Sequence, residues 1–108
     1  MYTEMVGRRG YSLERFVDLV STNAARIMGL YPRKGALAVG SDADIVVIDP
    51  SKSWTVSAES HHMSPDYNCW EGWELQGRVT TTILRGSVLV KDGNWVGSKT
   101  GGRFLERK

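Results

Sequence analysis

The most distinctive hydrophobic pattern in this chain is a run of four β-branched residues, Ile45 to Ile48. Turn-forming residues flank the run, with Gly40-Ser41-Asp42 before it and Asp49-Pro50 after it. A strand with one solvent-facing side alternates polar and apolar residues, whereas an unbroken apolar run is typical of a strand buried on both faces. The pattern therefore predicts a strand that ends at Asp49-Pro50 and needs a covering layer on each side, from this chain or from another.

A helical pattern precedes this strand. Apolar residues recur at i, i+3, i+4 and i+7, which is the spacing of one face of an α-helix, in Leu13, Phe16, Val17 and Val20. Ser12, directly before them, is a suitable N-cap. The sequence predicts an amphipathic helix here, with one face packed inward.

A second, shorter helix is predicted from Asn23 to Met28. Ser21-Thr22 offers a new N-cap, so the sequence favours a break between the two helices. Gly29 suits the C′ position that follows a helix, and Pro32 prevents the helix from resuming. Residues 1–11 are expected to form a loop or the frayed end of a preceding element.

The rest of the chain is β-like. Asp92-Gly93 suits a two-residue type I′ turn and predicts a β-hairpin between two flanking strands. The segment from Ala58 to Glu74 is long, and a loop of this length is usually functional or part of an interface. The predicted fold class is α+β, with two short helices followed by antiparallel or mixed strands. Those strands, after Ile45 to Ile48, are expected at residues 54–57, 79–84, 88–91 and 94–96.

Composition limits the size and the class of the protein. A chain of 108 residues makes one small domain, or part of a larger protein, and cannot form a complete (β/α)8 barrel of about 250 residues. The net charge of +2 is too small and too dispersed to favour a nucleic-acid partner, and Arg8-Arg9 is expected to be a solvated pair. Nothing at the start resembles a signal peptide or a membrane span, so we expect no membrane partner and a cytoplasmic location.

Glycines and aspartates near the strand suggest two kinds of site. The pattern Gly35-x4-Gly40-Ser41 lacks the lysine of a phosphate-binding loop, and a strand follows it instead of a helix, so we reject the phosphate interpretation. Asp42, Asp44 and Asp49 could suggest a metal site. Their positions favour structural roles, with Asp42 as a turn former and Asp49 as a terminator before proline.

Histidine and cysteine are both sparse. His61 and His62 are the only histidines, and neighbouring residues of an extended segment point to opposite sides, so they would rarely bind one ion together. We favour loop packing or hydrogen bonding for this pair over metal binding. Cys69 is the only cysteine, and without a Cys-His context we favour a small core or loop residue over a nucleophile.

Four tryptophans are the remaining candidates for binding. Trp54, Trp70, Trp73 and Trp95 could stack on a ligand, but aromatic residues in loops and hairpins more often close small cores or oligomer interfaces. The sequence has no evident Ser-His-Asp arrangement or paired-carboxylate spacing. From the residues alone, this is a small α+β domain of no evident activity.

Several stretches resemble a known family. The C-terminal region of the amidohydrolase superfamily is closely similar to residues 20–35 (VSTNAARIMGLYPRKG) and 40–50 (GSDADIVVIDP). The dihydropyrimidinase and D-hydantoinase branch is similar to residues 57–63 (SAESHHM), 66–68 (DYN) and 71–72 (EG). The resemblance covers essentially the whole chain.

The resemblance implies a fold and a division of the chain. The family combines a (β/α)8 barrel with a β-sandwich built from both ends of the chain. By this comparison, residues 1–33 are the terminal helical elements of an incomplete barrel, residues 34–96 are a portion of the C-terminal β-sandwich, and residues 97–108 are an extended tail. The missing layer over Ile45 to Ile48 would then come from sequence outside this chain.

The resemblance also implies a chemistry that this chain cannot complete. Relatives of this type hydrolyse cyclic amides with two zinc ions, held by histidines, an aspartate and a carbamylated lysine. None of those ligand motifs can be placed here, so the sequence assigns no catalytic, cofactor-binding or metal residue to this chain.

Three hypotheses follow. The first is that the chain is an inactive C-terminal fragment of a cyclic-amide hydrolase. The second is that it is an assembly module, which forms homo-oligomers through open strand edges. The third is that it is the small subunit of a split enzyme, in which a barrel-bearing partner chain supplies the zinc ligands.

Overall fold

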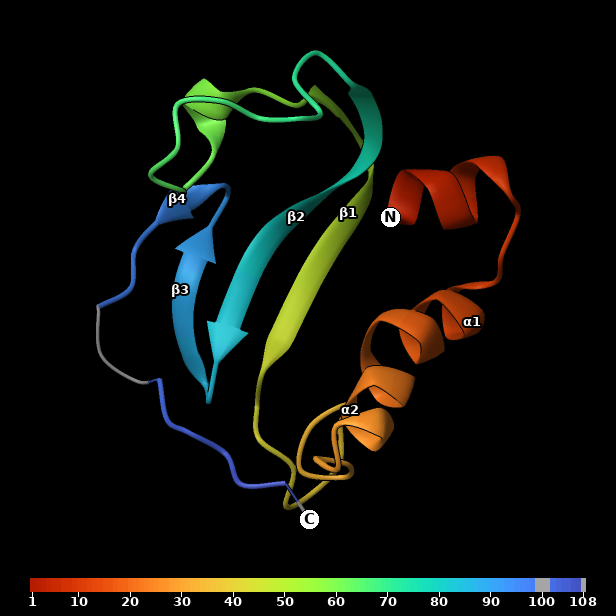
Figure 1. The fold of residues 1–108 in the computed structure, drawn as a ribbon, viewed down its shortest axis with the longest axis vertical. Helices are drawn as coiled ribbons and strands as arrows, with labels where there is room; N and C mark the ends of the chain where they lie inside the picture. The colour runs from red at the N-terminus through yellow and green to blue at the C-terminus, as the bar shows by residue number, and fades with distance from the viewer. Residues whose placement is uncertain (99–101, 108) are drawn as a thin grey trace.

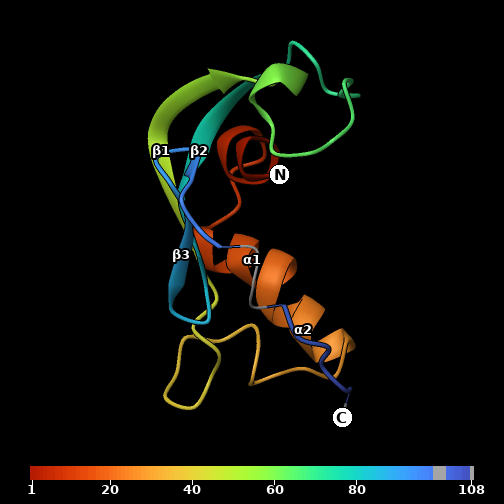
Figure 2. The same cartoon turned by 90° about the vertical axis from the view of Figure 1, so that its left-hand side faces the viewer.

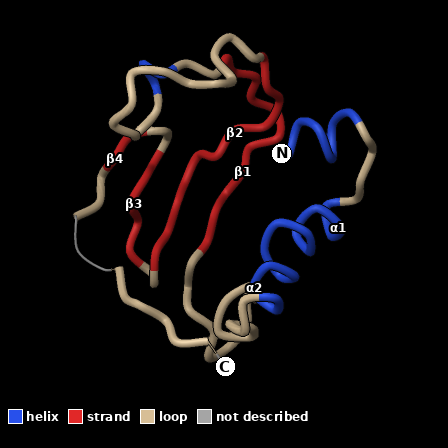
Figure 3. Tube along the Cα trace, viewed as in Figure 1, coloured by secondary structure: helices blue, strands red, loops and turns tan. Residues whose placement is uncertain are grey.

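The computed structural model describes residues 1–98 and 102–107 of the chain. It is an α+β fold, with a helical N-terminal part followed by one four-stranded antiparallel sheet (Figures 1 and 3). The sequence left open whether the strands pair in an antiparallel or a mixed sheet, and all pairs in the structure are antiparallel. Of the tail expected at 97–108, residues 99–101 and 108 lie outside the described residues.

The N-terminal part is more helical than the sequence predicts. Residues Thr3–Arg8 form a π-helix, η1, so the expectation of a loop for this stretch is wrong. After Ser12, whose side chain accepts a hydrogen bond from the Arg15 N–H at 3.2 Å, α1 covers Leu13–Val17. The predicted N-cap is confirmed.

The predicted break between two helices is wrong. A π-helical turn, η2 (Asp18–Thr22), joins α1 to α2 (Asn23–Ile27). Thr22 keeps helical backbone angles, and its hydroxyl donates to the Gly35 carbonyl at 2.9 Å instead of capping α2. A tertiary contact therefore uses the side chain that the sequence assigns to a cap. Gly29, with φ of +68°, ends the helix in the left-handed conformation, as predicted.

The sheet has the strand order β1-β2-β3-β4. Two-residue turns with positive φ join β2 to β3 at Arg85-Gly86 and β3 to β4 at Asp92-Gly93, and the second confirms the predicted hairpin. Strand β2 is longer than the predicted 79–84. The strands are β1 (Ile45–Thr55), β2 (Glu74–Leu84), β3 (Ser87–Lys91) and β4 (Asn94–Trp95).

Strand β1 does not end at Asp49-Pro50, so the predicted division into two strands is wrong. Asp49 pairs with Arg78 and Ser53 with Gln76, and the register shifts between them. Proline lacks an N–H donor, so it is tolerated in edge strands and at bulges. Pro50 lies in an edge strand, at the point where the register shifts. The strand therefore continues past the proline as far as Thr55, and Val56 and Ser57 fall outside it.

The chain buries little of its own apolar surface. Among the described residues, the buried hydrophobic ones are Phe16, Ala25 and Val56. Val46 and Val47, at the centre of the β-branched run, are 56% and 45% exposed. The prediction of burial on both faces is therefore wrong for this chain by itself.

The helical segment lies on one face of the sheet, and the loop after β1 lies on the same side (Figure 2). Tyr2 makes the contact, because its ring packs edge-on against Phe16 with centroids 5.5 Å apart and reaches the backbone of Gly77 in β2. None of the helices in the described part is long and apolar enough to cross a membrane.

Candidate functional site

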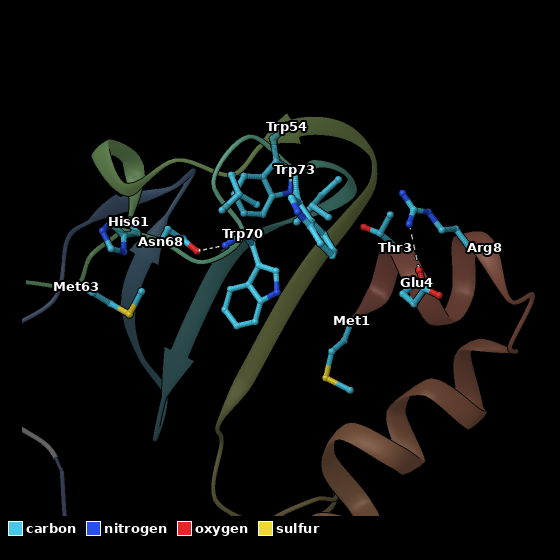
Figure 4. A pocket seen from close by; sticks show the side chains of 12 residues that line it. Met1, Thr3, Glu4, Arg8, Trp54, His61, Met63, Asn68, Trp70 and Trp73 are labelled. Carbon is cyan, nitrogen blue, oxygen red and sulfur yellow. Dashed lines mark hydrogen bonds and ion pairs between the residues drawn. The ribbon is translucent and has the colours of Figure 1, made fainter. Parts of the chain in front are cut away.

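An aromatic cavity lies between η1, the adjoining ends of β1 and β2, and the long loop that joins these strands (Figure 4). Its volume is about 440 Å³. We call it the aromatic cavity because three of the four tryptophans line it. Its lining consists of Met1, Thr3, Glu4, Arg8, Trp54, Val56, His61, Met63, Asn68, Trp70, Trp73 and Leu75.

The long loop is closed at its base by backbone pairing. The Val56 N–H donates to the Trp73 carbonyl and the Gly72 N–H donates to the Val56 carbonyl, both at 2.9 Å. The Glu71 carboxylate also accepts from the Ala58 N–H at 2.7 Å. A short 3-10 helix, η3 (Ala58–Ser60), begins the loop. These contacts fix the two ends of the loop and place its tryptophans beside the sheet.

The tryptophans have different surroundings. Trp54 donates from Nε1 to the Gly77 carbonyl at 3.1 Å, and the Arg78 guanidinium lies 5.6 Å from its ring. Trp70 and Trp73 are 57% and 55% exposed. Figure 4 shows the Trp70 indole projecting into the space between Met63 of the loop and Met1. The exposed indoles therefore form an apolar surface that this chain leaves open to solvent.

The two histidines make separate hydrogen bonds, as the sequence predicts. His61 Nε2 lies 3.0 Å from the Pro65 carbonyl oxygen, within the loop. His62 Nε2 lies 3.0 Å from the Gly93 carbonyl oxygen, in the β3–β4 turn. The second bond joins the outer part of the loop to the hairpin. Both histidines thus make the hydrogen bonds that the sequence predicts for them.

Helix η1 forms the opposite wall of the cavity, which sequence reasoning missed because residues 1–11 carry no strong helical pattern. Thr3 Oγ1 donates to the Gln76 carbonyl at 2.7 Å and fixes η1 on β2. Glu4 forms ion pairs with Arg8 at 3.3 Å and with Arg9 at 2.9 Å. The hydrogen bond from Arg9 lowers the pKa of the Glu4 carboxyl group. Arg8-Arg9 is therefore an exposed pair, as expected, but at the end of a helix.

The aspartates have structural roles. Asp42 accepts from Lys34 at 2.8 Å and from Arg33 at 3.2 Å. Asp44 is paired with Lys34 and accepts from the Arg85 N–H at 2.8 Å. This ion-pair cluster connects the segment before β1 to the β2–β3 turn.

The same cluster shifts the pKa values of its members. The hydrogen bond from Lys34 lowers the pKa of Asp42. Burial raises the pKa of Asp44, but hydrogen bonds from Lys34 and from the Arg85 N–H outweigh it, so the pKa of Asp44 is lowered. Burial by itself would lower the pKa of Lys34, but its hydrogen bonds to Asp42 and Asp44 outweigh this effect, so the pKa of Lys34 is raised above its ordinary value.

The remaining candidates lie apart from the cavity lining. Asp49 Oδ1 accepts from the Ser51 N–H at 2.9 Å, which makes it a local turn residue at the β1 bulge. Cys69 is an exposed thiol in the loop, and Trp95 lies on β4. The described residues contain no group of three or more His, Cys, Asp or Glu side chains that could hold a metal ion. The cavity lining is mainly apolar and aromatic.

Comparisons with known proteins support the family resemblance seen in the sequence. The sequence pattern of the Amidohydrolase family matches residues 1–94. A D-hydantoinase of Geobacillus stearothermophilus is 41% identical over 107 residues, which is 99% of this chain and 23% of that protein. A D-phenylhydantoinase of Escherichia coli O1:K1 / APEC is 47% identical over 104 residues, 96% of this chain and 22% of that protein.

Solved structures show the same relationship. A D-hydantoinase (dihydropyrimidinase) from Thermus sp. superimposes with a TM-score of 0.92 at 49% identity, over 98% of this chain and 23% of that one. An L-hydantoinase (dihydropyrimidinase) from Arthrobacter aurescens superimposes with a TM-score of 0.79 at 33% identity, over 85% of this chain and 20% of that one. The chain thus spans less than a quarter of the length of these relatives. It belongs to the amidohydrolase family, in which it corresponds to a segment of a hydantoinase-like protein.

Proposed function

We propose that this chain is the C-terminal segment of a cyclic-amide hydrolase of the dihydropyrimidinase or hydantoinase type, and that it is inactive by itself. The observation that carries the proposal is a mismatch between conformation and burial. The chain has the conformation of a segment of D-hydantoinases more than four times its length, yet it buries only a few apolar side chains within its described part. A conformation with so small a core requires surfaces from outside the segment.

The segment would join two parts of the enzyme. We assign residues 1–33 to the last helical elements of the barrel, residues 34–96 to the β-sandwich and residues 97–108 to an extended tail. The four-stranded sheet then supplies one part of the sandwich, and strands from outside the segment supply the rest. This arrangement gives Val46 and Val47 the covering layers that their sequence pattern requires. We assign the enzyme to the cytoplasm.

The metal centre would lie outside this segment. Zinc in this type of enzyme lowers the pKa of a bound water and polarises the substrate carbonyl. The donor set of the described residues does not fit such a centre, since no three ligand-type side chains come together. The role of this chain is then structural, to complete the fold that holds the centre.

A chimera tests the proposal. The matched 107-residue segment of the Geobacillus stearothermophilus D-hydantoinase is replaced by this chain, and ring opening of hydantoin is measured with zinc supplied. We expect the chimera to hydrolyse hydantoin, and both the isolated chain and the enzyme without the segment to be inactive. Turnover by the isolated chain, or a folded chimera without activity, contradicts the proposal.

A second candidate function is assembly, as an oligomerisation module or as the small subunit of a split amidohydrolase. Strand β1 supports it, because β1 is an edge of the sheet and carries exposed apolar residues. An open strand edge with apolar neighbours is a template for pairing with another chain. Activity after the isolated chain is mixed with a separate barrel polypeptide favours the split enzyme. A defined homo-oligomer that gains no activity from that polypeptide favours the module.

A further inference from the structure

The long helical segment ends with two carbonyl groups that its own backbone does not use. The segment is helical without a break through α1, η2 and α2, and the N–H groups of residues 28–31 bond to carbonyls of residues 24–26. The carbonyls of Ile27 and Met28 receive no backbone N–H within the described part of the chain. Carbonyl groups left over at a helix end are satisfied by side chains or by water.

The side chain of Arg107 binds both of these carbonyls. Its Nε donates to the Met28 carbonyl at 3.2 Å, and its Nη2 donates to the Ile27 carbonyl at 3.5 Å. A guanidinium group holds its N–H donors in a fixed fork, so one arginine can serve two adjacent acceptors. Its positive charge is also favourable at a helix C-terminus, where the helix dipole is negative. Arg107 therefore caps the helix from the other end of the chain.

The residues before Arg107 lie against the segment that follows the helix. Glu106 lines a hollow together with residues that connect α2 to β1, among them Pro32 and Ser41. Leu105 is partly buried. Figures 1 and 2 both place the end of the tail beside the end of α2. The contact of Arg107 with the helix is thus supported by its neighbours in the tail.

These contacts join both edges of the sheet to the same end of the helix. The strand order β1-β2-β3-β4 makes β1 and β4 the two edges. Residues 28–44 connect α2 directly to β1, and the tail that follows β4 returns to the end of α2. A sheet attached along β1 alone could pivot about that edge. The second attachment restricts this movement.

We propose that residues 102–107 form a strap, fastened by Arg107 to the C-terminal end of α2, which holds the sheet in position against the helical segment. The inference goes beyond the proposed function, which assigns the tail no contact. Positive charge in the tail is not sufficient for this role. Arg103 is exposed and makes no hydrogen bond or ion pair among the described residues.

Hydrogen exchange in the folded chimera tests the strap with three single substitutions. Arg107→Ala removes the cap. Arg107→Lys keeps the charge but replaces the fork of donors by a single ammonium group. Arg103→Ala is the matched control, because it removes the same charge from an exposed position of the same tail.

We expect Arg107→Ala to speed exchange of the N–H groups of residues 28–31 by about 2–5-fold, Arg107→Lys to speed it less, and Arg103→Ala to change it by less than about 1.5-fold. Unchanged exchange in Arg107→Ala, or an equal rise in Arg103→Ala, would overturn the strap. Slower exchange at higher protein concentration would also overturn it, because the tail of another copy would then cap the helix. Exchange is measured whether or not the chimera hydrolyses hydantoin, so failure of the proposed function remains a separate result.

Discussion

Gly77 is the residue on which the docking of the N-terminal helix depends. Its φ of +83° lies in the left-handed region, and a Cβ added to it would lie 2.5 Å from Cδ1 of Tyr2. Gly35 plays a similar part at the other end of the helical segment, where an added Cβ would lie 2.6 Å from the Ala25 Cβ. Both positions require glycine because a helix packs directly on the backbone there.

Replacing Gly77 therefore tests the docking contact. We expect Gly77→Ala to lower the free energy of unfolding by about 1–3 kcal/mol, from backbone strain and the displaced Tyr2 ring. Gly86→Ala is the matched control, since Gly86 has φ of +81° but no atom within 4 Å of an added Cβ. Urea unfolding of both variants, each made in the chimera that completes the fold, separates the effect of backbone strain from that of the Tyr2 contact. Equal losses of stability would contradict a role for Tyr2.

The ion-pair cluster predicts a response to acid. The pKa of Asp42 is lowered by its hydrogen bond from Lys34, so the folded state binds a proton more weakly than the unfolded chain. The stabilisation is therefore complete above the ordinary aspartate pKa of about 3.9 and is lost as the pH falls through the lower folded value.

We expect Asp42→Asn to reduce the loss of stability of the chimera between about pH 5 and pH 2, measured by urea unfolding at each pH. Asp66→Asn removes a carboxylate that has no ion pair within the described part of the chain, and serves as the control. An unchanged acid dependence in Asp42→Asn would show that the Lys34 pair contributes nothing to folding.

At the level of elements, the helix start is encoded locally. The Ser12 hydroxyl accepts from the Arg15 N–H, and this contact needs only the residues of the first turn. We expect Ser12→Ala to cost about 1 kcal/mol of stability and some helical circular dichroism, and Ser12→Asp to keep both near their original values. A loss of the same size in Ser12→Asp would indicate that the serine acts through another contact.

The helix break and the strand end were predicted wrongly for a shared reason. Thr22 suits a cap and Pro50 suits a strand end when each is judged by its neighbours in sequence. In the fold, Thr22 bonds to Gly35 and Pro50 lies at a bulge in an edge strand. Partners distant in sequence therefore decided both boundaries.

The candidate site was foreseen only in its parts. The length of the loop after β1 and its two tryptophans predicted a functional or interfacial segment, and the histidine pair was assigned to hydrogen bonding. The cavity itself requires the contact between η1 and β2, held by Thr3 and Gln76. That contact joins the start of the chain to its third quarter, and no periodic pattern signals it.

For the whole molecule, exposed apolar surface is the dominant property. Val46 lines a second cavity, between the helix and β1, and Val47 follows it on the strand, so its side chain points to the opposite face of the sheet. That face has no covering layer from the described residues. We expect the isolated chain to associate with itself as its concentration rises.

Sedimentation velocity over a range of concentrations measures this association. We expect Val47→Lys to weaken it, because the substitution removes apolar surface and adds a charge to an edge strand. Thr55→Lys adds the same charge at an exposed polar position of β1 and should change it less. A wild-type chain that stays monomeric at high concentration would contradict the expected association.

The sequence by itself determined the features that depend on neighbours along the chain. These are the helix start at Ser12, the helix end at Gly29, the type I′ turn at Asp92-Gly93 and the apolar character of the run from Ile45 to Ile48. Only the tertiary structure decided where the helix stays continuous, how β1 passes Pro50, and that the run of β-branched residues remains half exposed. The physical reason is that burial and register depend on partners distant in sequence, and here the segment leaves some of its apolar surface without partners of its own.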